Sequence, residues 1–378
     1  MDVGAGEKTD GHGAMNAKLM PFSSIPVIDI SALRTSDPVA RHATAERIGL
    51  ACEQVGFFYV KNHGIPESVI ERAYALSKEF HHSSNQQKSR VHVRNSQGVR
   101  GWTPTTADDD DDDPELYRLA DADPDYDYLT RPRLFDTLDL AGEIAEDDPD
   151  YLAGDILLVP NQWPDWIPGF RDGVMEYYDA VKEIGDLLFR AFELRLDLPN
   201  GFFAGMTTKT ASQLRLLHYP ENDLPMDNQH LGIGVHSDFE CFTILNQRSA
   251  GLQVMNAADE WVAAPPIDGT FIVNIGDMLE ALTNGRFKAT QHRVVNQGKE
   301  RFSLPLFFAT NYDTVIEPLP QFVSADQPAR YGSIIAGEHL AGFMIEGTKH
   351  LRKKVVNGEL QINFKIHSTN PFQRKAVN

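Results

Sequence analysis

The second half of the chain consists of short segments in which apolar and polar residues alternate, separated by Gly, Pro and Asn. This alternation is typical of half-buried strands, because successive side chains of a strand point to opposite faces. Regularly spaced strands of this kind favour a barrel or a sandwich. The predicted strands are Leu214–Tyr219, Gly232–His236, Phe242–Asn246, Leu252–Asn256, Trp261–Ala264, Phe271–Ile275, Ala289–Val295 and Phe302–Phe308.

In the first half of the chain, apolar residues recur with a longer period. Apolar residues recur every three or four positions between Arg171 and Leu196, which predicts a long amphipathic helix. Shorter helices are predicted at Ala45–Val55 and from Pro66 to about Phe80, and strands at Pro26–Ile30 and Phe57–Val60. Helices followed by a β-rich half indicate one mixed domain.

The ends of the chain differ from this domain. Residues 1–21 are polar and rich in glycine, and we expect a disordered N-terminal tail. A single domain is predicted for residues 22–370, with an acidic insertion at about 103–155, followed by a C-terminal tail at 371–378.

The insertion holds most of the acidity of the chain. Residues 101–155 include 19 Asp and Glu against 3 Lys and Arg, and Asp108–Asp113 are consecutive aspartates. Like charges repel one another and stay solvated, so we expect a flexible loop here. A site for calcium or a basic partner is the alternative, but the segment lacks the spacing of an ordered calcium loop.

Composition excludes several classes of protein. A net charge of −19 argues against a binder of nucleic acid or of anionic membranes, since both attract basic surfaces. Cys52 and Cys241 alone cannot build a disulfide framework or a cysteine-rich zinc site. No apolar run approaches the ~20 residues of a membrane span, and residues 1–20 lack an apolar signal core. We expect a soluble, cytoplasmic protein, and its oligomeric state stays open.

Three residues of the β-rich half suggest a metal site. His236 and Asp238 are two positions apart at a strand end, so both side chains can reach one ion. His292, separated from Asp238 by 53 residues, lies on another predicted strand. Two imidazoles and one carboxylate on one face of a metal form the facial triad of non-haem Fe(II) oxygenases. A bare His-x-Asp is a weak signal, and the alternative is a set of structural polar residues.

A second group of candidate site residues begins nine residues after His292. Arg301 and Ser303 share one face of a predicted strand. A guanidinium grips a carboxylate through two parallel charge-assisted bonds, so this pair can anchor the far carboxylate of a 2-oxo acid whose keto-acid end chelates the metal. Tyr219 can add a phenol donor, or can be a core aromatic residue. Other histidines, such as His81, His82, His63 and His218, are expected to serve packing.

A series of motifs strengthens these assignments. They run in the order of the family from about residue 25 to 310 and are Ile25–Ser31, Gly56–Pro66, Leu214–Pro220, His236–Leu245, Gly251–Val254, Val273–Asp277, Thr283–Arg286, Gln291–Val294 and Arg301–Ser303. With them the chain resembles the isopenicillin-N-synthase-like family of Fe(II)/2-oxoglutarate-dependent dioxygenases. The resemblance implies a mainly β fold with flanking helices, a distorted double-stranded β-helix (jelly roll, cupin-like).

The resemblance also implies the roles of the site residues. The family's iron ligands match His236, Asp238 and His292, and its cosubstrate clamp matches Arg301 and Ser303, with Tyr219 beside them. The implied cofactors are Fe(II), 2-oxoglutarate and O2, with ascorbate as a candidate reductant. Asn274, Gly276 and Asp277 match positions that support the fold, and we expect Asp277 to cap the helix that leads to Leu282.

Substrates of the family lie over the iron. Phe239 and Phe307 are therefore candidate pocket walls, and Arg215 is a candidate partner for an acidic substrate. Glu240 stands where many relatives have glycine, and it either contacts substrate or faces solvent.

The function expected from the resemblance is oxidation of an unactivated C–H bond of a small molecule in secondary or amino-acid-like metabolism. Hydroxylation is the default, and desaturation or ring closure are further outcomes. A same-fold Fe(II) oxidase that does not use 2-oxoglutarate is the first alternative. A non-catalytic jelly-roll binding module is the second, and a zinc hydrolase is third because no His-Glu-x-x-His motif occurs.

Overall fold

The computed structural model describes residues 22–105, 133–228 and 230–364. The expected tails at 1–21 and 371–378 and the aspartate run Asp108–Asp113 lie outside the described residues, so their structure is not tested.

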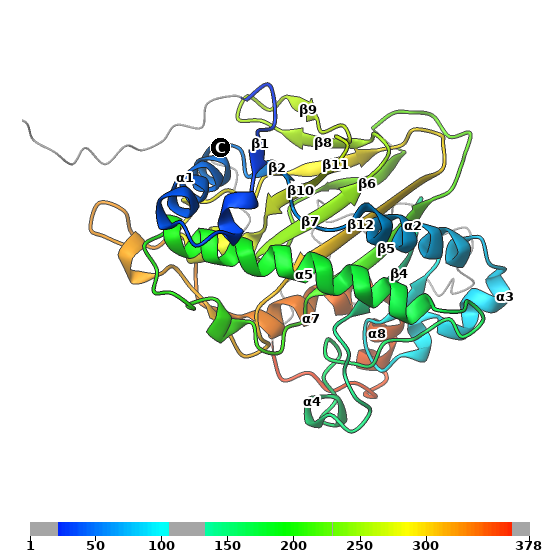
Figure 1. Cartoon of the computed structure of the whole chain (residues 1–378). Helices are drawn as coiled ribbons and strands as arrows, with labels where there is room; N and C mark the ends of the chain where they lie inside the picture. Colours follow the sequence, from blue (N-terminus) through cyan, green and yellow to red (C-terminus); the bar gives the residue numbers. More distant parts are fainter. Residues whose placement is uncertain (1–21, 106–132, 229, 365–378) are drawn as a thin grey trace, which may run out of the picture.

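Eight of the described strands form the larger sheet, in the order β1-β2-β10-β7-β12-β5-β4-β3 (Figure 1). Except for the parallel pair β1 and β2, neighbouring strands of this sheet are antiparallel. Their bounds are β1 Val27–Asp29, β2 Phe57–Lys61, β3 Gly101–Thr103, β4 Asp136–Ala141, β5 Gln213–Tyr219, β7 Phe242–Gln247, β10 Thr270–Ile275 and β12 Arg301–Phe308.

A smaller sheet packs against one face of the larger one. Its strand order is β6-β11-β8-β9, and a short hairpin of β13 and β14 lies apart from both sheets. The bounds are β6 Leu231–His236, β8 Leu252–Met255, β9 Trp261–Ala263, β11 His292–Val295, β13 Val315–Ile316 and β14 Ile334–Ile335. Apolar side chains of both sheets, such as Leu217 and Ile272 opposite Val254 and Val294, form one buried cluster. The two sheets with this core between them are the double-stranded β-helix.

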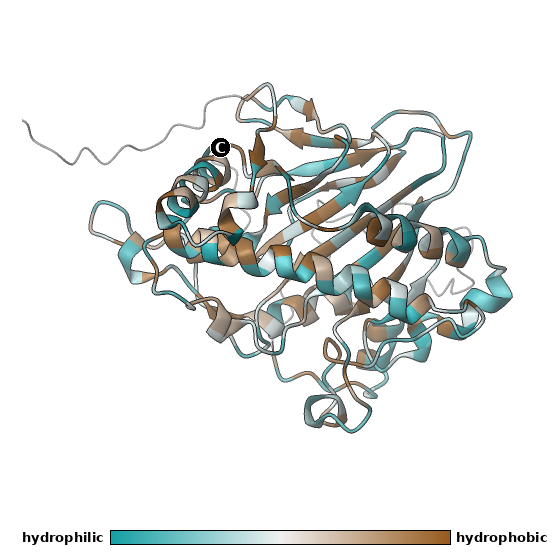
Figure 2. Cartoon of the chain, viewed as in Figure 1, coloured by the Kyte–Doolittle hydropathy of each residue, from teal (hydrophilic) through white to brown (hydrophobic). Residues whose placement is uncertain are grey.

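Helices cover the other face of the larger sheet. Figure 1 shows α5 crossing this face with α1 and α2 beside it. Figure 2 shows apolar residues along the strands and both apolar and polar residues along α5, as expected for a helix with one buried side. The helices are α1 Pro38–Gln54, α2 Glu67–His81, α3 Asn85–Lys88, α4 Pro149–Leu152, α5 Phe170–Arg195, α6 Asp277–Leu282, α7 Ala336–Gly347 and α8 Lys349–Val356.

The predicted strands of the β-rich half and the long helix are confirmed, with shifts at several ends. Helix α1 begins at Pro38 rather than Ala45, because Asp37 accepts hydrogen bonds from the first turn and Pro38 suits its first position. Strand β11 begins at His292 rather than Ala289.

Two expectations are wrong. Residues 136–141, which we placed in the acidic insertion, form strand β4 and pair with β5 in the larger sheet. Asp277 does not cap α6: it is the first residue of the helix, Gly276 is the N-cap, and no side chain bonds the cap. Helices α7 and α8 were not predicted. None of the helices in the described part of the chain combines the length and apolar character that a membrane span requires.

Candidate metal centre

Two strands of the smaller sheet bring the two histidines together. His236 ends β6, His292 begins β11, and the two residues are directly paired in the antiparallel ladder. Asp238 follows two residues later, where the chain leaves the smaller sheet for β7 of the larger one. Its Oδ1 lies 3.6 Å from His236 Nε2 and 3.5 Å from His292 Nε2. The three ligand atoms all lie within 4.8 Å of one another.

Backbone carbonyls fix both imidazoles in one orientation. The Nδ1–H of His236 donates to Gly234 O at 2.8 Å, and the Nδ1–H of His292 donates to Thr290 O at 3.1 Å. Because each Nδ1 carries the proton, each Nε2 keeps a lone pair that faces the centre. Such outer contacts are typical of metal-binding histidines.

The carboxylate of Asp238 is held in the same way. Its Oδ2 accepts hydrogen bonds from Thr243 Oγ1 at 2.5 Å and from Asn274 Nδ2 at 2.7 Å, which leaves Oδ1 for the centre. Gly276 allows β10 to end close to this loop, since a Cβ atom there would lie 2.2 Å from Glu240 O. Thr243 was assigned no role from the sequence. It lies in β7, on the same face of the strand as Gln247.

The charge states of two of the three residues suit a metal ion. Burial alone would raise the pKa of Asp238, but the charge of His292 and its hydrogen bond hold that pKa well below the usual range. Burial and the neighbouring charge of His292 lower the pKa of His236 to about 4. For His292, burial is outweighed by Asp238, so the pKa is raised. The ionised carboxylate of Asp238 and the neutral imidazole of His236 are the forms that bind metal ions, whereas His292 must release its extra proton when an ion binds.

Arg301, the first residue of β12, is buried, with only 4% of its surface exposed. Its Nη1 donates to Ser303 Oγ at 3.2 Å, and its Nη2 donates to Gln247 Oε1 at 3.1 Å. The guanidinium carbon lies 4.8 Å from the ring centroid of Tyr219, which is its partner across the strand pair. Gln247 was missed by the sequence prediction, because it reaches Arg301 only through the pairing of β7 with β12.

The Nε–H of Arg301 is buried and has no hydrogen-bond partner in the described structure. An unpaired buried donor of a charged group is costly, so this donor fits a site that receives an anionic ligand. The donor set of His236, Asp238 and His292 fits Fe(II) equally well. The residues present therefore fit both the metal and the 2-oxo acid that the resemblance implies.

Each of the three candidate substrate residues contacts another side chain in the described structure. Arg215 is bound at two points by Asp139, through Nε–Oδ1 at 2.7 Å and Nη2–Oδ2 at 3.2 Å. This ion pair already balances the charge that we expected an acidic substrate to meet. Phe307 lies near Arg215, with 5.7 Å between ring centroid and guanidinium carbon. The ring of Phe239 stacks on Phe343 of α7 at 3.9 Å.

Glu240 does not face solvent, because only 7% of its surface is exposed. Burial, followed by the charge of Asp238, raises its pKa to about 8, while a hydrogen bond with its own backbone and the charge of Arg215 act in the opposite direction. Among the described residues no other side chain forms a hydrogen bond or ion pair with the Glu240 carboxyl group. A buried carboxyl group without a side-chain partner is unfavourable for stability, so its presence near the centre needs another reason.

Comparison with known families agrees with this geometry. Residues 25–166 match the family described as non-haem dioxygenase in morphine synthesis N-terminal, and residues 210–310 match the 2OG-Fe(II) oxygenase superfamily. The chain belongs to the 2OG-Fe(II) oxygenase superfamily.

Two curated relatives and one crystal structure illustrate the similarity. The 2-oxoglutarate-Fe(II) type oxidoreductase hxnY of Emericella nidulans is 32% identical over 84% of this chain and 88% of its own length. A homoarginine-6-hydroxylase of Glycine max is 32% identical over 85% and 96%. A Neurospora crassa protein crystallised with alpha-KG and thymine is 26% identical over 85% of this chain and 96% of its own, with a TM-score of 0.71. The predicted family, jelly-roll fold and enzyme class are confirmed: this superfamily member is a 2-oxoglutarate-dependent oxygenase that acts on small molecules with Fe(II) and O2.

Proposed function

We propose that His236, Asp238 and His292 hold the Fe(II) of this oxygenase, and that Arg301 and Ser303 bind the far carboxylate of 2-oxoglutarate. The observations that support this proposal are three converging ligand atoms and a buried guanidinium with an unused N–H on β12, the strand that pairs with β7. Tyr219 supports the clamp by packing its ring against the guanidinium.

The chemistry is divided between the cofactors and the chain. Bound Fe(II) and 2-oxoglutarate supply the oxidation with O2, in which 2-oxoglutarate loses CO2 and becomes succinate. The chain orients the ligands through Gly234 O, Thr290 O and the two donors to Asp238. The apolar core between the sheets excludes water from the site. We propose hydroxylation of an unactivated C–H bond as the outcome; a cytoplasmic location and a role in secondary or amino-acid-like metabolism stay predictions.

Labelled 2-oxoglutarate tests this proposal. Incubation of the protein with Fe(II), ascorbate and a panel of small molecules is expected to give labelled succinate in a substrate-dependent way. If product forms from a panel member without succinate, the oxidase that does not use 2-oxoglutarate replaces this proposal. If neither product nor succinate forms while 2-oxoglutarate binds, the binding module replaces it.

The panel is best built from nitrogen-bearing molecules. One relative is named for homoarginine, and a structural neighbour was crystallised with thymine; both molecules carry N–H groups. Glu240 offers a buried acceptor for such a group. We propose that the substrate is a small molecule with an N–H group bound by Glu240.

Replacing Glu240 with methionine tests that contact. We expect the KM for the substrate found in the panel to rise about tenfold, as for the loss of one buried hydrogen bond. The KM for the cosubstrate should not change. The melting temperature should hold or rise, because an apolar side chain replaces a buried carboxyl group that lacks a side-chain partner.

Glu183→Gln, on the exposed side of α5, is the matched control and should change neither constant. An unaltered KM for substrate in Glu240→Met, or a fall in stability, would assign Glu240 a structural role.

A further inference from the structure

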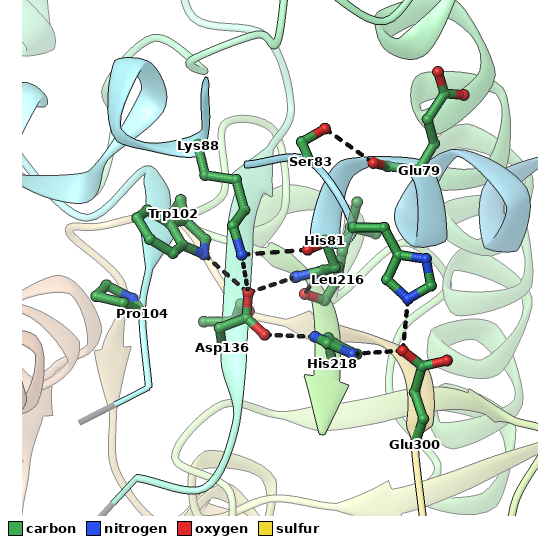
Figure 3. A network of polar contacts seen from close by, with 12 residues as sticks. Glu79, His81, Ser83, Lys88, Trp102, Pro104, Asp136, Leu216, His218 and Glu300 are labelled. Carbon is green, nitrogen blue, oxygen red and sulfur yellow. Dashed lines mark hydrogen bonds and ion pairs between the residues drawn. The ribbon is translucent and has the colours of Figure 1, made fainter. Parts of the chain in front are cut away.

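A second group of metal-binding side chains lies outside the candidate metal centre. His82 follows the last turn of α2, His218 lies in β5, and Glu300 immediately precedes β12. The Oε1 of Glu300 is 2.6 Å from His82 Nε2 and 3.0 Å from His218 Nε2. Figure 3 shows His218 between Glu300 and the buried Asp136. The ligand atoms of the three residues lie within 4.8 Å of one another.

Both ring nitrogens of His218 face carboxylate oxygens, and a neutral imidazole can donate to only one of them. Its Nδ1 lies 2.7 Å from Asp136 Oδ1, and its Nε2 faces Glu300. A carboxylate oxygen only accepts hydrogen bonds, whereas a neutral imidazole has one N–H to give. A second positive species, a proton or a metal ion, must therefore lie on the Glu300 side.

Asp136 decides which nitrogen keeps the proton. It is buried, and it also accepts from Trp102 Nε1 at 3.0 Å, while Lys88 Nζ lies at 3.4 Å. This fixed carboxylate holds the Nδ1–H of His218 and turns the Nε2 lone pair toward Glu300. A carboxylate behind an imidazole is the arrangement that orients metal-binding histidines.

The neighbouring His81 completes the network without being a ligand. Its Nδ1 lies 2.9 Å from Asp136 Oδ2 and its Nε2 lies 3.0 Å from Leu216 O, so both nitrogens face partners other than Glu300. His82 and Glu300, in contrast, are open to solvent, with 46% and 34% of their side chains exposed. An ion can enter from that side and keep water as a further ligand.

We propose that His82, His218 and Glu300 form a second metal site, which binds a divalent transition ion such as Zn²⁺. Two imidazoles, one carboxylate and an open position match the ligands that zinc accepts. Bound there, the ion ties the end of α2 to the start of β12, one residue before Arg301. The proposal does not depend on the function assigned to the candidate metal centre.

Zinc titration of the metal-free full-length protein tests the site. The protein is stripped with EDTA, and binding of ZnCl2 is followed by isothermal titration calorimetry and elemental analysis. The wild type is expected to bind one equivalent more than His82→Ala, and one more than Glu300→Ala. His236→Ala should lose a different equivalent, so His236→Ala/Glu300→Ala should bind two fewer than the wild type. Both His82 and Glu300 are exposed, so these variants should fold, which melting without metal checks.

His42→Ala is the matched control, since His42 is an exposed histidine 3.7 Å from a carboxylate, Glu46, on α1. It should bind as much zinc as the wild type. Zinc should raise the melting temperature of His236→Ala but not that of His236→Ala/Glu300→Ala, because an ion that binds only the folded state stabilises it. If His82→Ala or Glu300→Ala binds as much zinc as the wild type, the contacts around Glu300 are proton-mediated hydrogen bonds and the proposal is overturned. If His236→Ala/Glu300→Ala binds only one equivalent of zinc less than the wild type, the lost ion belongs to the candidate metal centre and the second site is refuted.

Discussion

Replacing Asp238 with alanine is expected to reduce turnover to the detection limit and to abolish binding of Fe(II) at the candidate metal centre. The Oδ1 of Asp238 is the one carboxylate ligand atom within reach of both His236 Nε2 and His292 Nε2 in the described structure. Without it, two imidazoles remain, one of them with a pKa lowered to about 4 by burial, and neutral ligands alone hold a divalent ion poorly. Iron content after anaerobic loading, with succinate release in parallel, measures both effects.

The same substitution should cost some stability without unfolding the protein. Thr243 and Asn274 lose the acceptor that both share, and a buried donor left unpaired costs about 1–3 kcal/mol. Asp227→Ala serves as the control, because Asp227 is an exposed carboxylate that also pairs with a histidine, His230. It should keep iron and activity. An Asp238→Ala protein that retains iron and turnover would place the metal elsewhere.

The parts of the fold that could be predicted are those in which a short range of sequence determines the structure. Alternation located most strands of the two sheets to within about three residues, although β3 and β4 were not predicted. Strand β4 was missed because aspartates stand at positions 136 and 139, and acidic residues favour a loop by composition. These two aspartates are buried in the structure because each has a cationic or imidazole partner on another element: Asp136 has His81 and His218, and Asp139 has Arg215.

Some residues of the candidate site could likewise be predicted from the sequence, and others could not. His236, Asp238 and Arg301–Ser303 could be predicted because a strand presents every second side chain on one face. Gln247 could not be assigned, since its contact with Arg301 depends on which strands are neighbours and in which register. For Arg215, sequence supplies a charge but not the partner that balances it. That partner, Asp139, is 76 residues away along the chain.

Replacing Arg301 with lysine is expected to weaken the use of 2-oxoglutarate, raising the cosubstrate KM by about one to two orders of magnitude. Lysine keeps the positive charge but lacks the planar guanidinium that bonds a carboxylate at two points. This loss is expected to weaken the binding free energy of 2-oxoglutarate by roughly 1.5–3 kcal/mol. The ammonium group also cannot reach Ser303 and Gln247 at once in the way that Nη1 and Nη2 do. Succinate release is measured against 2-oxoglutarate concentration at saturating substrate, and kcat should fall much less than kcat/KM, because Arg301 is remote from the reacting carbon in the proposed arrangement.

Arg293→Lys is the matched control for this experiment. Arg293 lies in β11, bonds Gln253 and packs over Trp261, so it is an arginine of the same fold with no part in the proposed clamp. Gln247→Leu should raise the cosubstrate KM by a smaller factor than Arg301→Lys, because Gln247 only orients the guanidinium. If Arg301→Lys leaves that KM unchanged, the buried Nε–H does not face the cosubstrate and the clamp must lie elsewhere. If Arg301→Lys and Arg293→Lys raise it equally, the effect follows from positive charge in general, and the two-point grip is not its cause.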